Sequence, residues 1–221
     1  MDELVRQAMA KWPNVPHCYG WLSLDRRGQW RMRDEAAQAA GELGDPIRHA
    51  ALLAFIARNY DCDEGGRWYF QNGPQRVYVE LAYAPFVVRL SWDAAANDGK
   101  GAPVLKDQLG HEFTAQACLL DEDGNVAFVG TTPSSDDAEN RRRDAPLALL
   151  HDHDIDLLTR VSDLAQAAEI AQTSDDTADA EAAVRLHWQN GDALPFATVH
   201  AGTLPQTYGF ERNPRAEDTN R

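Results

Sequence analysis

The chain has 221 residues, a formal net charge of -14 and 43% hydrophobic residues, which is typical of a globular protein with one large or two small domains. Its six Trp, six Tyr and seven Phe exclude an intrinsically disordered chain. The excess of 35 Asp and Glu over 21 Lys and Arg excludes general binding to nucleic-acid polymers, and no apolar run approaches the roughly 20 residues of a membrane-spanning helix.

Cysteine use and the N-terminal sequence indicate the compartment. Cys18, Cys62 and Cys118 are odd in number and far apart, and they form no Cys-x-x-Cys pair or disulfide framework. The first residues lack a basic segment followed by an apolar stretch, so no signal peptide is visible. We therefore expect a cytoplasmic protein with reduced thiols and no membrane partner.

Residues 1–59 show helix and hairpin signals in turn. The predicted elements are a helix at 3–12, strands at 19–24 and 29–32, a short helix at 34–40 and a helix at 45–59. Pro13 ends the first helix, and Asp34 is a suitable N-cap for the short one. Asp45 as N-cap and Pro46 at the first helical position give the last helix the clearest signal.

The hydrophobic pattern then changes to period two. Strands are predicted at Arg67–Gln71 and Arg76–Leu81, because the Asn72-Gly73-Pro74 segment between them is typical of a hairpin turn. An apolar run at 86–90 predicts another strand. Asp, Asn, Gly and Ala dominate residues 91–103, which indicates a long loop or a domain boundary.

The second half repeats these signals more weakly. Strands are expected at 112–120, 125–129, 147–150, 183–188 and 196–200, with a helix at 155–171. Residues 131–145 are polar, 174–181 form an acidic linker, and the tail from Glu211 is expected to fray.

One turn pattern recurs along the chain, as Asp25-x-x-Gly28-x-Trp30, Asp63-x-x-Gly66-x-Trp68 and Asp121-x-x-Gly124-x-Val126. Asp and Gly are the usual hairpin residues, which explains the pattern better than duplication does, and an EF-hand is excluded because the ligand set is incomplete. Short meanders with a few helices predict an α+β fold. We expect two small subdomains of antiparallel strands with packed helices, at about 1–90 and 104–221, with the helix at 45–59 packed on the first sheet.

Several motifs carry a family resemblance. They are the segment from Trp12 to Trp21, Gly44-x-Pro46-Ile47-Arg48, Trp68-Tyr69, Gln75 to Val79, and Ala84-Pro85-Phe86-Val87. On these residues the chain resembles an uncharacterised conserved proteobacterial family of unknown function. It resembles more distantly a two-domain family of unknown function with a pleckstrin-homology-like second domain. The likeness covers residues 12–90 well and the second half poorly, where 131–145 and 172–181 are acidic inserts.

The distant resemblance implies two similar α+β domains with a ligand bound between them, and a role in signalling. It brings no catalytic residues. The sequence itself also lacks a Gly-x-Ser-x-Gly nucleophile motif and the glycine-rich nucleotide-binding motifs. Cys18 follows His17, but neighbouring residues of a strand point to opposite faces, so a thiolate pair is not expected. No cofactor is expected, and an enzyme is less favoured than a binding protein.

His151-Asp152-His153-Asp154 is the most metal-like segment. On a strand, His151 and His153 would share a face and could ligate one ion, provided that His111, His187 or His200 converged on them. The favoured interpretation is an exposed turn between a strand and a helix, with Asp152 or Asp154 as the cap.

The hairpin offers a better candidate site. Alternation places Trp68 and Phe70 on a core face and gathers Arg67, Tyr69, Gln71, Arg76 and Tyr78 on the other face. Arginine can hold a carboxylate or phosphate in two-point contact, and tyrosine can stack on a planar group. The ordinary alternative is a solvated face with cross-strand pairs such as Arg67 with Glu80.

The hypothesis from sequence is a cytoplasmic small-ligand-binding or regulatory module. Its site would lie near the subdomain interface, with Arg76 contacting the charge of a small anionic or planar ligand and Tyr78 contacting its ring. The alternatives are a metal-dependent hydrolase using His151 and His153, and a protein-interaction scaffold that binds a protein partner.

Overall fold

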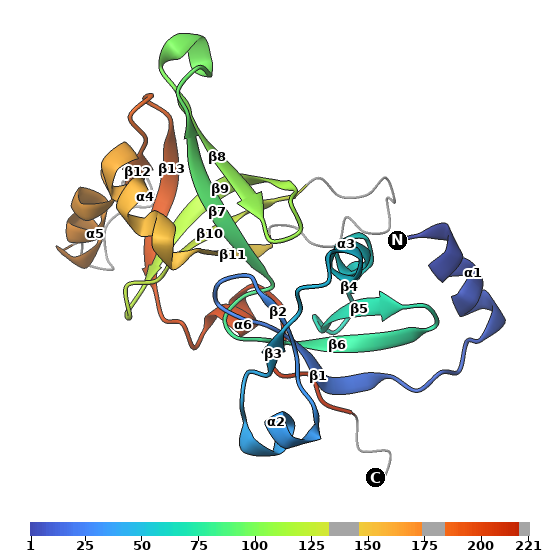
Figure 1. The fold of residues 1–221 in the computed structure, drawn as a ribbon. Coiled ribbons are helices and arrows are strands. Elements are labelled where there is room, and N and C mark those ends of the chain that lie inside the picture. The colour runs from blue at the N-terminus through green and yellow to red at the C-terminus, as the bar shows by residue number, and fades with distance from the viewer. Residues whose placement is uncertain (133–145, 174–183, 217–221) are drawn as a thin grey trace. The chain divides into compact units, whose positions relative to one another are not determined.

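The computed structural model describes residues 1–132, 146–173 and 184–216 of the chain, which divides into two compact units (Figure 1). Unit 1 holds Met1–Pro85 together with the C-terminal segment from Gly209, and unit 2 holds Phe86–Tyr208. Each unit combines one sheet with helices, which confirms the α+β fold of two subdomains. The sequence-based boundaries were 1–90 and 104–221, whereas contacts divide the chain after Pro85. The expectations for 133–145 and 174–183 lie outside the described residues.

Unit 1 contains a six-stranded sheet in the order β3-β2-β1-β6-β5-β4. Its elements are α1 (Glu3–Lys11), β1 (Cys18–Leu24), β2 (Trp30–Met32), α2 (Glu35–Ala40), β3 (Asp45–Pro46), α3 (Ala50–Arg58), β4 (Tyr60–Cys62), β5 (Trp68–Asn72) and β6 (Gln75–Leu81). Strands β1 and β6 are parallel, and the other named pairs of this sheet are antiparallel. The parallel pair brings two segments far apart in sequence side by side.

The core face of this sheet matches the predicted alternation. Trp68, Phe70, Val79 and Leu81 are buried, and the ring of Phe55 on α3 meets Phe70 edge to face at 5.2 Å. Helix α3 therefore packs on this sheet, as expected.

The expected start of α3 at Asp45 is wrong. Asp45 and Pro46 form β3, an edge strand paired with β2, and α3 begins at Ala50 with His49 as its N-cap. Proline has no N–H to donate, so an edge strand tolerates it, while the next N–H, of Ile47, donates to the carbonyl of Trp30. Asp45 and Pro46, which the capping pattern assigned to the start of the helix, thus form backbone hydrogen bonds within the sheet instead.

The C-terminal segment belongs to unit 1. The N–H of Glu211 donates to the carbonyl of Gly66 at 3.0 Å, and the N–H of Leu81 donates to the carbonyl of Arg212 at 2.8 Å. Phe210 is buried. The expected fraying from Glu211 is therefore wrong for these residues, because they complete backbone pairing beside β5 and β6.

Unit 2 contains a seven-stranded sheet in the order β10-β11-β7-β8-β9-β13-β12. Its strands are β7 (Phe86–Asp93), β8 (Ala102–Asp107), β9 (Glu112–Asp121), β10 (Val126–Thr131), β11 (Leu147–Leu150), β12 (Arg185–His187) and β13 (Ala193–Val199). Its helices are α4 (Ile155–Val161), α5 (Leu164–Thr173) and α6 (Leu204–Thr207), with short 3-10 helices at Asn97–Gly99 and Asp152–Asp154. Because β10 also pairs with β9, five of the strands form a closed ring of pairings.

Two expectations for unit 2 are wrong. The loop expected at 91–103 is shorter than predicted, since β7 and β8 extend into both ends of this range and pair from Ser91 with Val104 to Asp93 with Ala102, which leaves residues 94–101 as the connection. The single helix expected at 155–171 is broken between α4 and α5. Ser162 is extended there and bridges to Trp188, and the carboxylate of Asp163 accepts the N–H of His187 at 2.7 Å.

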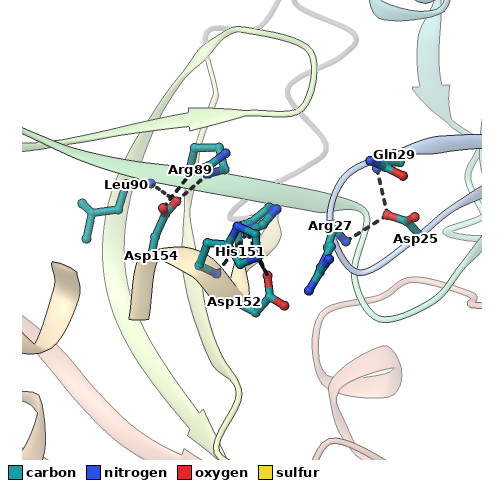
Figure 2. A network of polar contacts seen from close by, with 9 residues as sticks. Asp25, Arg27, Gln29, Arg89, Leu90, His151, Asp152 and Asp154 are labelled. Atoms are coloured by element: carbon teal, nitrogen blue, oxygen red, sulfur yellow. Dashed lines mark hydrogen bonds and ion pairs between the residues drawn. The ribbon is translucent and has the colours of Figure 1, made fainter. Parts of the chain in front are cut away.

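The recurring Asp-x-x-Gly segments each form a hairpin turn of the same type, and a fourth segment of this type begins at Asp107. In each copy the Gly N–H donates to the Asp carbonyl, and Oδ1 of the Asp accepts the N–H groups two and four residues later (Figure 2 shows the copy at Asp25). The glycines have positive φ, between 74° and 89°, which this turn requires. Oδ1 accepts the same backbone hydrogen bonds in all four turns. The turns therefore differ in the groups that contact Oδ2.

Candidate functional site

The register of the β5–β6 hairpin places the predicted site residues on one face. Tyr69 lies opposite Tyr78, and Gln71 lies opposite Arg76. The alternation of the two strands therefore brings these four side chains together as the sequence indicates.

This face is more enclosed than a solvated sheet surface. Tyr69, Gln71 and Tyr78 are buried, with Tyr78 only 1% exposed, while Arg67 and Arg76 are half-buried. The suggested cross-strand pair of Arg67 with Glu80 is wrong: Arg67 pairs with Asp63 at 2.8 Å, and Glu80 pairs with Arg33. Buried tyrosines on both strands indicate a packed side-chain cluster rather than a solvent-exposed sheet face.

Asp63 organises one side of the cluster through the turn that leads into β5. Its Oδ2 accepts hydrogen bonds from Nε of Arg67 at 2.8 Å and from the hydroxyl of Tyr78 at 3.0 Å. Burial raises the pKa of this carboxyl, but the hydrogen bonds from the backbone and guanidinium of Arg67 and from Tyr78 outweigh it, so the pKa lies below its ordinary value. Asp63 is therefore ionised at neutral pH and fixes both donors.

Tyr78 is the centre of an aromatic stack. Tyr19 of β1 lies parallel to it, with ring centroids 4.6 Å apart, and His17 meets it edge to face at 5.7 Å. The guanidinium carbon of Arg67 lies 5.2 Å from its ring centroid. Burial raises the pKa of Tyr78, so its hydroxyl stays protonated. The expected role of Tyr78 as a stacking platform for a ligand conflicts with this arrangement, because Tyr19 already stacks on its ring.

Arg76 is held differently from Arg67. Its guanidinium carbon lies 4.5 Å from the ring centroid of Tyr69, and its side chain hydrogen-bonds to Tyr78. Among the described residues it forms no ion pair with a carboxylate. Oε1 of Gln71, the residue opposite Arg76, is buried and lacks a hydrogen-bond partner in the same part of the chain. The cluster thus has a partly exposed cation whose charge is not balanced by direct contact.

His17 and Tyr19 were missed as members of this site. They join it because β1 lies parallel to β6, a pairing between distant segments for which neither segment carries a local signal. Burial, followed by the charges of Arg76 and Arg67, lowers the pKa of His17. The neighbouring Cys18 has its pKa raised by burial, which disfavours the thiolate.

A second polar cluster lies in unit 2, where β11 leads into α4 (Figure 2). Asp154 accepts hydrogen bonds from Nε and an Nη of Arg89 at 2.6 and 2.9 Å and from the N–H of Leu90 at 3.0 Å. His151 is buried, and its Nδ1 lies 2.9 Å from Oδ1 of Asp152. Burial, with a further contribution from Arg89, lowers the pKa of His151, so its imidazole is neutral at neutral pH.

The three other histidines considered as metal ligands do not join this cluster. Each lies near a different carboxylate: His111 near Asp107, His187 beside Asp163, and His200 near Glu122. His153 does lie beside His151, with ring centroids 4.9 Å apart. In the part of the chain that the structure describes, His151, Asp152 and His153 are the group whose ligand atoms lie close enough to hold an ion.

No helix among the described residues is long and apolar enough to cross a membrane. A family model, DUF2944, described as "Protein of unknown function (DUF2946)", matches residues 1–215. The comparison with curated proteins gives no match.

Two solved structures are similar to this chain. One is a DUF1285 family protein from Shewanella baltica OS155, with 12% identity and a TM-score of 0.40 over 63% of this chain and 91% of that one. The other is a DUF1285 family protein from Silicibacter pomeroyi DSS-3, with 17% identity and a TM-score of 0.44 over 90% of this chain and 97% of that one.

Proposed function

Because the chain belongs to the DUF2944 family, whose function is unknown, we propose a function from its own residues: unit 1 is a binding module for a small anionic ligand, with Arg76 as the main contact. Membership of this family confirms the resemblance to an uncharacterised family of unknown function. The anionic group is a carboxylate or a phosphate, the two groups that a guanidinium holds at two points.

One observation carries the proposal. Arg76 is half-buried and lies over Tyr69, yet it has no carboxylate partner among the described residues of a chain with a net charge of -14. Arg31, Arg33 and Arg89, by contrast, each form an ion pair. A partly desolvated cation without a counter-ion is costly, and an anionic ligand would supply the missing charge.

The surroundings of Arg76 suit such a ligand. Stacking on a buried tyrosine limits the orientations of the guanidinium before binding, which lowers the entropic cost of fixing it. Arg67 and His17 add positive or potentially positive groups around the same tyrosines. Tyr69 and Tyr78 have pKa values raised by burial, so they remain neutral and do not repel an anion.

His17 couples binding to pH. Burial and the charges of Arg76 and Arg67 lower its pKa, so His17 is mostly neutral in the free protein at neutral pH. A bound anion offsets those two charges and raises the pKa of His17. Affinity therefore increases as pH falls toward the pKa of His17 in the complex, provided that the ligand keeps its charge.

A regulatory or signalling role and a cytoplasmic location are part of the same proposal. The cluster does not pair a nucleophile with a general base, so the proposed module fits a sensor better than a catalyst. All three cysteines lie in the described residues and none forms a disulfide, which supports a reducing compartment. The prediction that the site faces the other half of the chain stays a prediction.

A thermal-shift experiment tests the binding proposal. The full-length protein is heated with inorganic phosphate, benzoate or adenosine monophosphate at fixed ionic strength, and the midpoint of unfolding is recorded. A ligand of the native state raises this midpoint in a concentration-dependent manner. We expect the shift to be lost in Arg76→Gln and kept in Arg48→Gln, which removes an exposed arginine of the same unit.

Removing Arg76 should weaken binding by about 1.5–3 kcal/mol, or one to two orders of magnitude. An equal shift in the two variants would mean that the anions act through general charge screening. The proposal is then wrong.

A further inference from the structure

Residues 151–153 of unit 2 place three metal-ligating groups together. Nδ1 of His151 lies 2.9 Å from Oδ1 of Asp152, and the same oxygen lies 4.0 Å from Nε2 of His153. One ligand atom from each residue lies within 4.8 Å of the other two. These residues belong to unit 2, whereas the residues of the proposed anion site belong to unit 1.

Nδ1 of His151 lies close to both of the residues that follow it. This nitrogen accepts the N–H of His153 at 3.2 Å and also faces the carboxylate of Asp152 at 2.9 Å. A metal ion at this position would be held by Nδ1 of His151 and Oδ1 of Asp152 together, and Nε2 of His153 lies near the same oxygen.

The backbone that carries these ligands is fixed. The N–H of His151 donates to the carbonyl of Val88 at 2.9 Å, and the N–H of Asp154 donates to the carbonyl of His151 at 2.9 Å. The Arg89–Asp154 ion pair ties the same turn to β7 (Figure 2). Asp154 opposes the charge of Arg89, and Asp152 adds a second carboxylate beside His151.

The separations come close to those of a metal site. Zinc bonds to imidazole nitrogen and carboxylate oxygen measure about 2.0–2.2 Å, so two ligand atoms of one ion lie at most about 4.3 Å apart. The exposed His153 ring, with 65% of its side chain accessible, can close the remaining gap by rotation. Coordination at Nδ1 would replace the long hydrogen bond from His153.

We propose that His151, Asp152 and His153 bind one late first-row divalent metal ion, of which Zn²⁺ is the best match. Two imidazoles and one carboxylate suit such ions better than Mg²⁺ or Ca²⁺, which prefer oxygen ligands. Three protein ligands leave at least one coordination position to water or to a further ligand.

The experiment measures metal binding by the full-length protein. Apo protein is titrated with Zn²⁺ in competition with a chromophoric chelator, and Co²⁺ is added separately to record the visible absorption of a protein-bound ion. We expect one equivalent of Zn²⁺ per chain. Affinity should fall about tenfold or more in His153→Gln and in Asp152→Asn, with loss of the cobalt absorption. Both side chains are exposed, so these variants should fold, which circular dichroism checks.

His200→Gln is the matched control, since His200 is also exposed and lies near a carboxylate, with Nδ1 3.9 Å from Glu122. Its affinity for Zn²⁺ should equal that of the unmodified protein. The proposal is overturned if the unmodified protein binds no equivalent of Zn²⁺, if His153→Gln and Asp152→Asn bind it as tightly, or if His200→Gln loses as much affinity as they do.

Discussion

The hydroxyl of Tyr78 donates a hydrogen bond to Oδ2 of Asp63 at 3.0 Å, which ties β6 to the turn between β4 and β5. The donor is almost fully buried, and the acceptor also binds the guanidinium of Arg67. This contact joins a structural turn to the proposed binding surface.

Tyr78→Phe should lower the free energy of unfolding by about 1–2 kcal/mol. The substitution keeps the ring that stacks on Tyr19 and removes only the hydroxyl that donates to Asp63. Urea denaturation followed by tryptophan fluorescence measures the change. Tyr19→Phe is the control, because its hydroxyl has no hydrogen bond to the residues that the structure describes. If the two variants lose equal stability, the Asp63 contact does not stabilise unit 1.

Asp63 and Asp107 should titrate in opposite directions although they occupy the same position in copies of one turn. Donors at Oδ2 lower the pKa of Asp63. The Oδ2 of Asp107 is buried and accepts no hydrogen bond from the described residues, with His111 3.6 Å away, and burial raises the pKa of Asp107. Carboxyl-carbon NMR shifts recorded against pH measure both. The reverse order would contradict the assigned role of Oδ2.

The stability contributed by Asp63 follows from the sign of its shift. Because its pKa is lower in the folded state than the ordinary value of 3.8, its contribution is present above about pH 4 and is lost as pH falls through the folded pKa. Asp63→Asn should therefore lower stability at pH 7 and reduce the loss of stability below pH 4. Urea denaturation of both proteins across this range measures the difference. Parallel stability curves would show that the shift does not contribute.

Gly66→Ala should cost more stability than Gly73→Ala. Both glycines have positive φ, at 78° and 58°, so each substitution strains the backbone. At Gly66 the added Cβ would also lie 2.2 Å from the carbonyl oxygen of Gly209, whereas nothing lies within 4 Å at Gly73. Gly66→Ala should also release the C-terminal segment, so trypsin should cut at Arg212 faster than in Gly73→Ala. Equal cleavage rates would contradict the docking of this segment.

The three thiols should react with iodoacetamide at different rates. Burial raises the pKa of Cys62 and of Cys118 to about 12, with Asp63 adding to the effect at Cys62, so about one molecule in 10⁴ carries the thiolate at pH 8. Cys18 is half-buried and has a smaller upward shift in pKa, so it should react first. Mass spectrometry of partially alkylated protein gives the order, and early modification of Cys118 would contradict it.

Local signals predict the elements that depend on local chemistry. Asp34 accepts the N–H of Ala37 and Gly41 ends α2 in the left-handed region, as the capping pattern indicates. The Asp-x-x-Gly turns and the β5–β6 hairpin follow from side-chain-to-backbone bonds and from alternation within a few residues.

The errors arise where distant segments compete for the backbone. Strand β3 replaces the first turn of the expected helix because Asp45 and Pro46 pair with β2, and Trp188 breaks the later helix at Ser162. Competition between distant segments also limits the prediction of the site. The alternation of the strands predicts the shared face of Tyr69, Gln71, Arg76 and Tyr78. The position of Tyr19 beside Tyr78 depends on the parallel pairing of β1 with β6, which no local pattern predicts.

The most direct test of the anion site is an NMR titration of the Nε–H signal of Arg76 in the full-length protein. Inorganic phosphate and benzoate are added at constant ionic strength, and the signal is assigned from its absence in Arg76→Gln. A bound carboxylate or phosphate accepts hydrogen bonds from the guanidinium, so we predict a saturable shift for at least one of the two anions. Benzoate keeps its charge between pH 6 and pH 8, so it should bind more tightly at pH 6 than at pH 8 as His17 gains its proton. An Arg76 signal that does not move with either anion, or moves no more than the signal of Arg48, would contradict the account.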